Sequence, residues 1–347
     1  MANHLKIAIV ILNWNGEKLF DTFLPSVLKY SNSENIEIIV ADNASTDNSV
    51  NHLKQFYPSV KIISLETNFG FAEGYNQALK SVEAEYLVLL NSDVKVTENW
   101  IVNCISIFEK DNKIAAVQPK ILSYNNPNFF EYAGAAGGFI DKFGYPFCRG
   151  RILNRIEEDS GQYNQQSQIF WASGACIFVK NSAFKNAGGF DGDFWAHMEE
   201  IDLCWRLKNS GFKIVYEPQS VVYHLGGGTL SYGSPKKIYL NFRNNLFMLF
   251  KNLPRQQFKR IFIIRMVLDG VAAVKFILGL NFWEFWAVVK AHASFYRNLR
   301  ELIRKRKEAQ KLVLVKEHSE VYSKSIMWKF FIQKKRKFSD LNFLPKT

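Results

Sequence analysis

The feature that most constrains this chain is an alternation, over its first 110 residues, of short apolar runs with amphipathic stretches. The apolar runs are IAIVILNW, IEIIVAD, VKIISL and YLVLL, and the stretches that follow them span residues 17–30, 46–57, 71–82 and 97–110. Strands buried on both faces read as continuous apolar runs, and intervening helices make such strands parallel. The pattern therefore predicts an α/β fold with a parallel sheet covered by helices.

Each of these predicted strands ends in polar, turn-forming residues. The four strand ends are Asn13 to Gly16, Asp42 to Ser45, Asn68 to Gly70, and Asn91 to Asp93. Any one of them is equally well explained as a turn or a helix N-cap. Because ligands bind at the carboxyl ends of parallel strands, four such loops on one sheet edge favour a binding site there.

Composition limits the class of protein. The 347 residues are 48% apolar and 15% aromatic, which is typical of a folded globular chain with a substantial core. The four cysteines form no CxxC pair, so neither a zinc knuckle nor a dense disulfide framework is predicted, and a reducing cytoplasm fits best. The first apolar run is too short for a secretory signal, so the catalytic part is expected in the cytosol.

The net charge of +12 is unevenly distributed. Residues 1–235 hold 19 Lys and Arg against 25 Asp and Glu, whereas residues 236–347 hold 25 against 7. A strongly basic C-terminal third predicts an anionic partner surface, either membrane headgroups or nucleic acid.

The middle of the chain has a mixed pattern. Strands are expected near 114–122, 172–180, 212–216 and 220–224, and a helix from Glu199 to Asn209 that Gly211 ends. The segment 124–168 lacks strong periodicity and predicts a long loop or hairpin.

Residues 258–300 are strongly apolar and aromatic, but a membrane-spanning helix is not expected, because charged residues prevent any clean run of about 20 uncharged residues. The interrupting residues are Arg265, Asp269, Lys275, Glu284 and Lys290. Amphipathic helices in the membrane interface, with Trp283, Phe285 and Trp286 at headgroup level, match the pattern better. A helical subdomain or a dimer interface is the alternative. The closing segment 300–347 has 14 basic and 5 acidic residues, which favours an anionic leaflet but is also typical of a solvated tail.

Three groups of residues carry candidate chemistry. Asp93 follows a buried strand, where a carboxylate can hold a divalent cation, although a helix N-cap is the commoner role. Glu199 and Glu200 begin a helix, where crowded carboxylates can produce a general base. Helix N-terminal acid enrichment and an Asp202–Arg206 pair explain Asp202 but not both glutamates. His224 precedes three glycines and Thr229, whose backbone amides suit phosphate.

These residues together resemble a known family. VILNWNG, VADNASTDNS, NFGFAEGYNQAL and LLNSDV, in this order and spacing, are similar to family 2 glycosyltransferases with the GT-A fold, particularly rhamnosyltransferase-like bacterial members. The resemblance covers roughly residues 5–250, so residues 1–250 are expected to form the GT-A domain. Its donor half is expected at about 1–122 and its acceptor half at about 123–250. A basic, amphipathic, membrane-associating region is expected at 251–347.

The resemblance implies roles for the strand-end residues. Asp42 would contact the nucleobase, and Asp93 would bind the metal as the second acid of an Asp-x-Asp motif whose first position is here Asn91. The other residues implied in nucleotide-sugar binding are Asn13, Asn15, Asn43, Asp47, Asn68, Gly70 and Asn76, with Asn91 at the weakened motif position.

Downstream, the family's Glu-Asp motif falls on Glu199 and Glu200, and Glu200 stands where the base is expected. His224 would be a second metal ligand, and Arg243 with Asn244 would contact a diphosphate. The implied cofactor is a divalent cation, Mg²⁺ or Mn²⁺.

The resemblance implies an inverting, metal-dependent transfer of a sugar, rhamnose being one candidate, from a dTDP- or UDP-sugar. The acceptor would be a polyprenyl-linked saccharide in cell-surface polysaccharide synthesis, at the inner face of the cell membrane. The alternative is a catalytically inactive GT-A-like scaffold or binding protein whose basic tail binds an anionic surface. Nucleic acid is not the expected partner, because the strand ends are acidic. NWNGEKL after the first strand, in place of GxGxxG, argues against a dinucleotide-dependent oxidoreductase.

Overall fold

The first half of the chain folds as a parallel sheet covered by helices, as predicted. The computed structural model describes residues 6–226 and 234–343. Strand β1 lies between β4 and β2, and β2 pairs with β3, all in parallel. The elements are β1 (Ile7–Asn13), α1 (Glu17–Tyr30), β2 (Ile36–Asp42), α2 (Ser49–Phe56), β3 (Lys61–Ser64), α3 (Gly70–Leu79), β4 (Tyr86–Asn91) and α4 (Trp100–Lys110).

Both faces of this sheet are buried, which explains the uninterrupted apolar runs. Along β1, Ala8 and Val10 pack into one apolar cluster with Tyr75 of α3. Ile9 packs into another, on the opposite face, with Trp100 of α4. Successive side chains of a strand point to opposite faces, so an alternating apolar and polar sequence would have left one face without a core.

The second half extends the same sheet with antiparallel pairing. β12 (Cys176–Lys180) lies between β4 and β6 (Ile114–Ser123) and is antiparallel to both. β13 (Lys213–His224) runs parallel to β6, and β5 (Val94–Val96) and β11 (Ser167–Gln168) pair with it. The two strands predicted at 212–216 and 220–224 are parts of β13, separated by a register shift between Glu217 and Val221.

The segment predicted as one loop or hairpin holds a second, small sheet. Its strands are β7 (Gly138–Asp141), β8 (Pro146–Cys148), β9 (Arg151–Ile152), β10 (Arg155–Ile156) and, from the end of the chain, β14 (Val321–Tyr322). The strands have two to four residues, too few to show periodicity. β14 pairs with β7.

The basic closing segment is therefore partly packed against the small sheet. Phe338 and Phe343 contact Phe139 and Phe147 of the small sheet, with ring centroids 5.3–6.4 Å apart.

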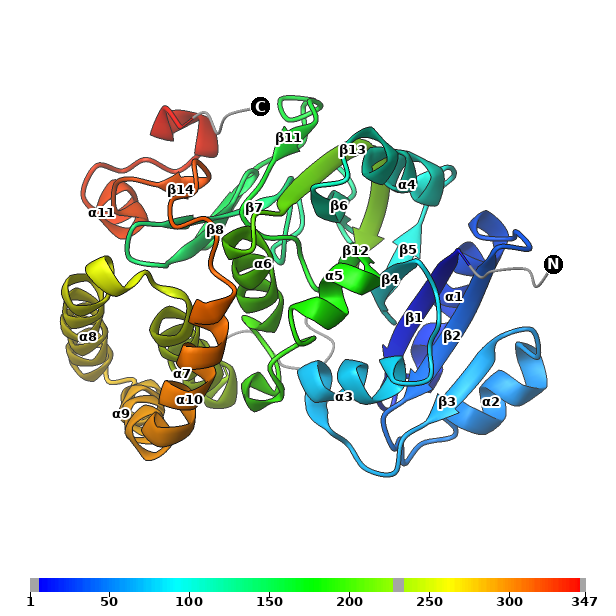
Figure 1. Ribbon diagram of the computed structural model, residues 1–347, viewed down its shortest axis with the longest axis horizontal. Coiled ribbons are helices and arrows are strands. Elements are labelled where there is room, and N and C mark those ends of the chain that lie inside the picture. The colour runs from blue at the N-terminus through cyan, green and yellow to red at the C-terminus, as the bar shows by residue number, and fades with distance from the viewer. Residues whose placement is uncertain (1–5, 227–233, 344–347) are drawn as a thin grey trace.

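The long helices between residues 235 and 311 gather at the other end of the molecule from β1, β2 and β3, as Figure 1 shows. Helix α6 has the predicted bounds, and the apolar region 258–300 forms two long helices. Among the helices described, none combines the length and hydropathy needed to cross a bilayer. The bounds are α5 (Asn181–Asn186), η1 (Gly192–Phe194), α6 (Glu199–Asn209), α7 (Pro235–Asn252), α8 (Arg255–Leu278), α9 (Phe282–Arg297), α10 (Leu299–Lys311), α11 (Ile326–Phe331) and η2 (Phe338–Leu341).

Candidate active site

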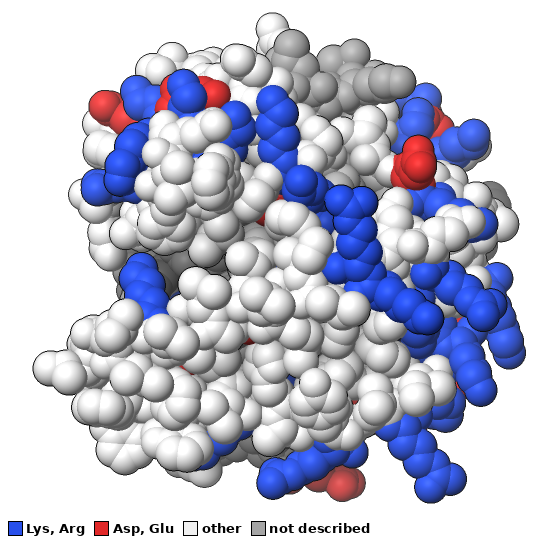
Figure 2. Space-filling view, turned by 90° about the vertical axis from the view of Figure 1, so that its left-hand side faces the viewer, with Lys and Arg blue, Asp and Glu red and all other residues white. Residues whose placement is uncertain are grey.

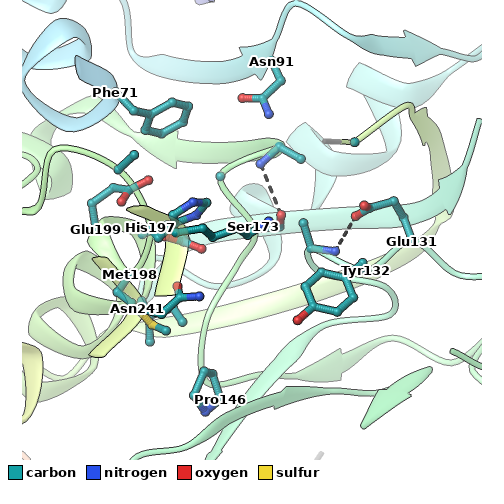
Figure 3. A pocket seen from close by; sticks show the side chains of 18 of the residues that line it. Phe71, Asn91, Glu131, Tyr132, Pro146, Ser173, His197, Met198, Glu199 and Asn241 are labelled. Atoms are coloured by element: carbon teal, nitrogen blue, oxygen red, sulfur yellow. Dashed lines mark hydrogen bonds between the residues drawn. The ribbon is translucent and has the colours of Figure 1, made fainter. Parts of the chain in front are cut away.

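A cavity of about 1030 Å³ lies at the carboxyl ends of β1, β2 and β4. In Figure 3, Glu199 and His197 lie on one side of it, Glu131 and Tyr132 on another, and Phe71 and Asn91 at its upper edge. Its lining brings together nine of the predicted site residues: Asn15, Asn43, Asn68, Gly70, Asn91, Asp93, Glu199, Glu200 and His224. The expected convergence of strand-end loops with the downstream motifs is therefore present.

Amide side chains cross-link the loops after the first strands. Asn43 accepts a hydrogen bond from the backbone N–H of Phe69 (3.0 Å) and donates to Oδ1 of Asn68 (3.1 Å) and to the carbonyl of Gly70 (2.9 Å). Asn15 accepts from the N–H of Thr46 at 2.7 Å. An amide both donates and accepts, so Asn can hold two loops at once.

Asp42 lies beneath these loops and is almost fully buried. It accepts hydrogen bonds from the Asn13 side-chain amide (2.9 Å) and from the N–H of Ser45 (3.1 Å). Neither Asp42 nor Asn13 lines the cavity. Their contacts in this structure orient the loop that carries Asn43.

Three other predicted binding residues also lie outside the lining. Asp47 accepts from the N–H groups of Glu17 and Ser49. Asn76 donates to the carbonyl of Phe190 (2.8 Å) and accepts from its N–H (3.0 Å). Arg243 is the third, and its contacts are described below.

Gly70 lets the loops after the first strands meet the segment before α6. Its φ is +76°, and a Cβ here would stand 2.6 Å from the indole of Trp195. The next N–H, that of Phe71, donates to the carbonyl of Trp195 at 2.7 Å. Only glycine combines this backbone conformation with this close approach.

Asp93 and His224 meet at the cavity floor. Nε2 of His224 lies 3.1 Å from Oδ1 of Asp93, and its Nδ1 lies 3.3 Å from Oε2 of Glu131. Burial opposes the imidazolium form, but the carboxylates of Glu131 and Asp93 outweigh it and raise the pKa of His224 to about 10. Burial disfavours the charged form of Asp93 as well, which by itself would raise its pKa. The neighbouring imidazolium of His224 outweighs burial, so the pKa of Asp93 is lowered overall.

Asp93 and His224 fit a divalent cation as a two-ligand site, which the cation would occupy by displacing the Nε2 proton of His224, because only a neutral imidazole binds a metal. Within residues 6–226 and 234–343, no three His, Cys, Asp or Glu side chains form a complete metal cage. A cation that binds a nucleotide diphosphate needs only one or two protein ligands, because phosphate oxygens and water complete its shell. Glu131 at Nδ1 orients the imidazole, as carboxylates do for metal-bound histidines. Gly227, Gly228 and Thr229 lie outside the described residues.

Glu199 and Glu200 begin α6 at the opposite wall. Glu199 is buried and Glu200 is partly buried. The Oε2 atom of each carboxyl has no hydrogen-bond partner among the described residues. Burial raises the pKa of Glu200 to about 7, although backbone N–H groups of the first helical turn oppose the shift. Burial and the adjacent Glu200 raise the pKa of Glu199 well above its usual value.

The segment that leads into α6 has an unusual backbone. Trp195, His197 and Met198 have φ values of 62°, 70° and 72°. Such left-handed conformations cost about 1–3 kcal/mol each in non-glycine residues and are found mainly at functional sites. With this backbone conformation, the side chains of His197 and the two glutamates line the cavity.

Asn244 and Arg243 hold this strained segment. The side-chain amide of Asn244 donates to the carbonyls of Phe194 (2.9 Å), Ala196 (2.8 Å) and His197 (2.7 Å). Arg243 donates to the carbonyls of Asp193 (2.8 Å) and Phe194 (2.9 Å). In this structure the pair predicted to bind a diphosphate therefore clamps the loop before the glutamates, and Arg243 does not line the cavity.

Asp202 has the structural role that the sequence allowed. It is fully buried and accepts hydrogen bonds from Arg206 (2.8 Å), Lys251 (2.7 Å) and Asn252 (2.7 Å). The network joins α6 to α7 beneath the site.

Sequence reasoning missed several lining residues. Glu131 and Tyr132 stand in the segment without periodicity, and nothing local distinguishes them. His197 was overlooked beside the acidic pair. Burial and then the charge of Lys237 lower its pKa to about 4, and its Nε2 has no hydrogen-bond partner among the described residues. The other missed lining residues include Trp14, Phe71, Ser173, Trp195 and Asn241.

Comparison with known proteins identifies relatives of this chain. Among curated proteins, an N-acetylglucosaminyl-diphospho-decaprenol L-rhamnosyltransferase of Mycobacterium tuberculosis is 24% identical over 236 residues, which are 63% of this chain and 75% of that protein. A poly-beta-1,6-N-acetyl-D-glucosamine synthase of Staphylococcus epidermidis is 27% identical over 221 residues, 63% of this chain and half of that protein.

Solved structures share the fold. GalNAc-T7 with UDP, GalNAc and Mn²⁺ superposes with a TM-score of 0.62 at 17% identity, over 96% of this chain and 57% of that one. S. aureus TarS 1-349 with UDP-GlcNAc superposes with a TM-score of 0.56 at 16% identity, over 89% of this chain and 84% of that one. Residues 8–188 match the model of glycosyl transferase family 2. With its GT-A fold and this match over more than half its length, the chain belongs to glycosyl transferase family 2 and is a glycosyltransferase.

Proposed function

We propose that this glycosyltransferase moves a sugar from a dTDP- or UDP-linked donor to a polyprenyl-linked saccharide, in a single inverting displacement with Glu200 as general base. The observation that carries the proposal is the placement of Glu200. Its carboxyl, with a pKa raised to about 7 and an oxygen without a partner among the described residues, lines the same cavity as Asp93 and His224. The proposed base and the proposed diphosphate site thus line the same cavity.

The donor would occupy the strand-end side of the cavity. Asn15, Asn43 and Asn68 offer amide groups there, and Trp14 offers a half-exposed aromatic ring. Asp93 and His224 would hold the divalent cation, which neutralises the charge of the departing diphosphate when bound. The structural neighbours GalNAc-T7, solved with UDP and Mn²⁺, and TarS, solved with UDP-GlcNAc, support this choice of donor and cofactor.

The acceptor would occupy the side lined by α6 and the small sheet. Ionised Glu200 takes the proton of an acceptor hydroxyl, the hydroxyl oxygen forms a bond to the anomeric carbon, and the bond from that carbon to the diphosphate oxygen breaks. No covalent sugar–enzyme intermediate forms, so the anomeric configuration inverts. Burial and the adjacent Glu200 raise the pKa of Glu199 well above its usual value, which favours its protonated form.

The name of the mycobacterial relative supports the sugar and the acceptor class. It describes a rhamnosyl transfer to a saccharide on diphosphodecaprenol. A polyprenyl-linked acceptor resides in a membrane, which agrees with a basic C-terminal third and with placement at the inner face of the cell membrane.

Two substitutions test the division of labour. Glu200→Gln keeps the size of the side chain but removes the base, so donor binding should persist while turnover falls by at least about 100-fold. Asp93→Ala should abolish metal-dependent donor binding, measured by titration calorimetry with and without Mn²⁺. Glu109→Gln and Asp21→Ala, at exposed carboxyls remote from the cavity, are matched controls. Near-wild-type kinetics in Glu200→Gln would refute its role as base.

A further inference from the structure

Helix α8 carries a stripe of exposed apolar side chains. Its members follow one another at intervals of three or four residues, so they fall on one side of the helix. Ile263, Val267, Val271, Val274 and Leu278 are 64%, 61%, 61%, 56% and 81% exposed. Single exposed apolar residues are ordinary on protein surfaces, but a continuous row of five marks an interaction site.

The stripe continues through the turn between α8 and α9. Leu280 and Trp283 are 76% and 74% exposed, and Phe282 and Trp286 are more than half exposed. Tryptophan concentrates where an apolar phase meets water, because its ring is amphipathic. We call the nine residues of the stripe and turn the α8–α9 face: Ile263, Val267, Val271, Val274, Leu278, Leu280, Phe282, Trp283 and Trp286.

Basic residues border this face. Figure 2 looks onto this side of the molecule and shows a broad uncharged area with Lys and Arg gathered around its margins. In α8 and α9 the acidic residues are Asp269, which is buried, and Glu284. Beside the face, α11 and the turn after it present Trp328 and Ile332 together with a cluster of exposed lysines: Lys334, Lys335 and Lys337.

The active-site cavity extends to this same side. Its lining includes Lys275 of α8 and Phe331 of α11, whose ring lies 4.9 Å from the Lys275 ammonium. Arg336, above the ring of Phe330, and buried Arg265 also line it. The far end of the cavity is therefore cationic and opens beside exposed apolar side chains.

We propose that the α8–α9 face docks on a bilayer with anionic headgroups, and that the cavity mouth between α8 and α11 then lies at headgroup level. A lipid-linked acceptor could enter from the membrane without leaving it, its diphosphate meeting Lys275 and Arg336. This entry route rests on the function proposed above, whereas the docking does not. Anionic headgroups complement the basic border, while a second copy packed through the same face would bring like charges together.

Flotation of the full chain with lipid vesicles tests the docking. Vesicles that contain phosphatidylglycerol should bind the chain, and binding should weaken in high salt and with phosphatidylcholine alone. The double change Leu278→Asp and Trp283→Asp should reduce binding at least about tenfold, since it removes two inserted side chains. The matched control changes Val102 and Phe56, which are 66% and 57% exposed on α4 and α2, to Asp and should bind as wild type.

The orientation has its own readout. All four native cysteines are buried, so an environment-sensitive dye can be attached selectively at Phe331→Cys or Val102→Cys. On vesicle binding the dye at 331 should shift to shorter wavelength and the dye at 102 should not. Equal shifts would overturn the orientation.

Melting temperature and light scattering, measured on the same preparations, separate the outcomes. Equal flotation of the two folded double variants would overturn the docking, as would a wild-type dimer that Leu278→Asp converts to monomers. Vesicle binding without any donor turnover would instead refute the proposed function and leave the docking intact.

Discussion

Glu199 and Glu200 are adjacent in sequence but differ in what surrounds their carboxyl groups. Glu199 is buried and Glu200 is partly exposed to the cavity. Burial raises the pKa of both carboxyls, and the charge of Glu200 raises that of Glu199 further. Glu200, with a pKa raised to about 7, is the member that can cycle between base and acid.

This assignment predicts a pH dependence with a definite sign. A raised carboxyl pKa means that Glu200 is protonated below about pH 7 and ionised above it. Since the base must be ionised, kcat/KM should fall about tenfold per pH unit below that point and level off above it. Initial rates from pH 5 to 8.5 measure this. A flat profile, or an identical limb in Glu200→Gln, would contradict the assignment.

At the scale of elements, the site depends on how α7 holds the entry to α6. The left-handed residues Trp195, His197 and Met198 persist because Asn244, on α7, binds three carbonyls of that segment. Helix α7 thus positions the glutamates, and its residues Lys237, Asn241 and Asn245 also line the cavity.

Replacing Asn244 should release the strained segment. Asn244→Ala leaves buried carbonyls without a donor, so the free energy of unfolding should fall by about 2–3 kcal/mol. Turnover should fall by more than donor affinity, because Asn43 and Asn68 remain in place. Asn298→Ala is the control, since the Asn298 amide also donates to a backbone carbonyl but is exposed. Equal stability losses in urea denaturation would argue against the clamp.

At the scale of the whole molecule, the end of the described chain belongs to the core. Phe338 is 5% exposed among the rings of Phe139, Phe147 and Tyr163. A basic segment that reads as a tail therefore closes the small sheet through its few aromatic residues.

This packing predicts a stability effect. Phe338→Ala should lower the free energy of unfolding by about 3–5 kcal/mol, because it opens a cavity among aromatic rings. Phe56→Ala, at a ring that is 57% exposed, should change it by under about 1 kcal/mol. Urea denaturation of both variants decides the point. A small loss in Phe338→Ala would show that the segment adds little to the core.

The sequence predicted the parallel strands of the sheet and nine of the residues that line the cavity, for a physical reason. Because both faces of the sheet are buried, continuous apolar runs in the sequence indicate its strands. Because its loops are short, the polar residues that directly follow those runs indicate the site. Glu131 and Tyr132 lie between β6 and β7, outside any named strand or helix, and the backbone N–H of Glu131 donates to the carbonyl of Ile121 in β6. Such a segment has no periodic signal in the sequence. Arg243 was assigned to a ligand because a sequence does not show which backbone carbonyls will lie nearby.

The most direct test of the central claim is transfer itself. The purified chain would be incubated with a panel of nucleotide sugars and Mg²⁺ or Mn²⁺, with and without a polyprenyl diphosphate-linked saccharide, and the released nucleoside diphosphate and glycosylated acceptor would be measured. We predict acceptor-stimulated, cation-dependent consumption of one dTDP- or UDP-sugar with inversion at the anomeric carbon, lost in Glu200→Gln and retained in Glu109→Gln. Consumption of no donor in the panel, or unchanged transfer by Glu200→Gln, would contradict it.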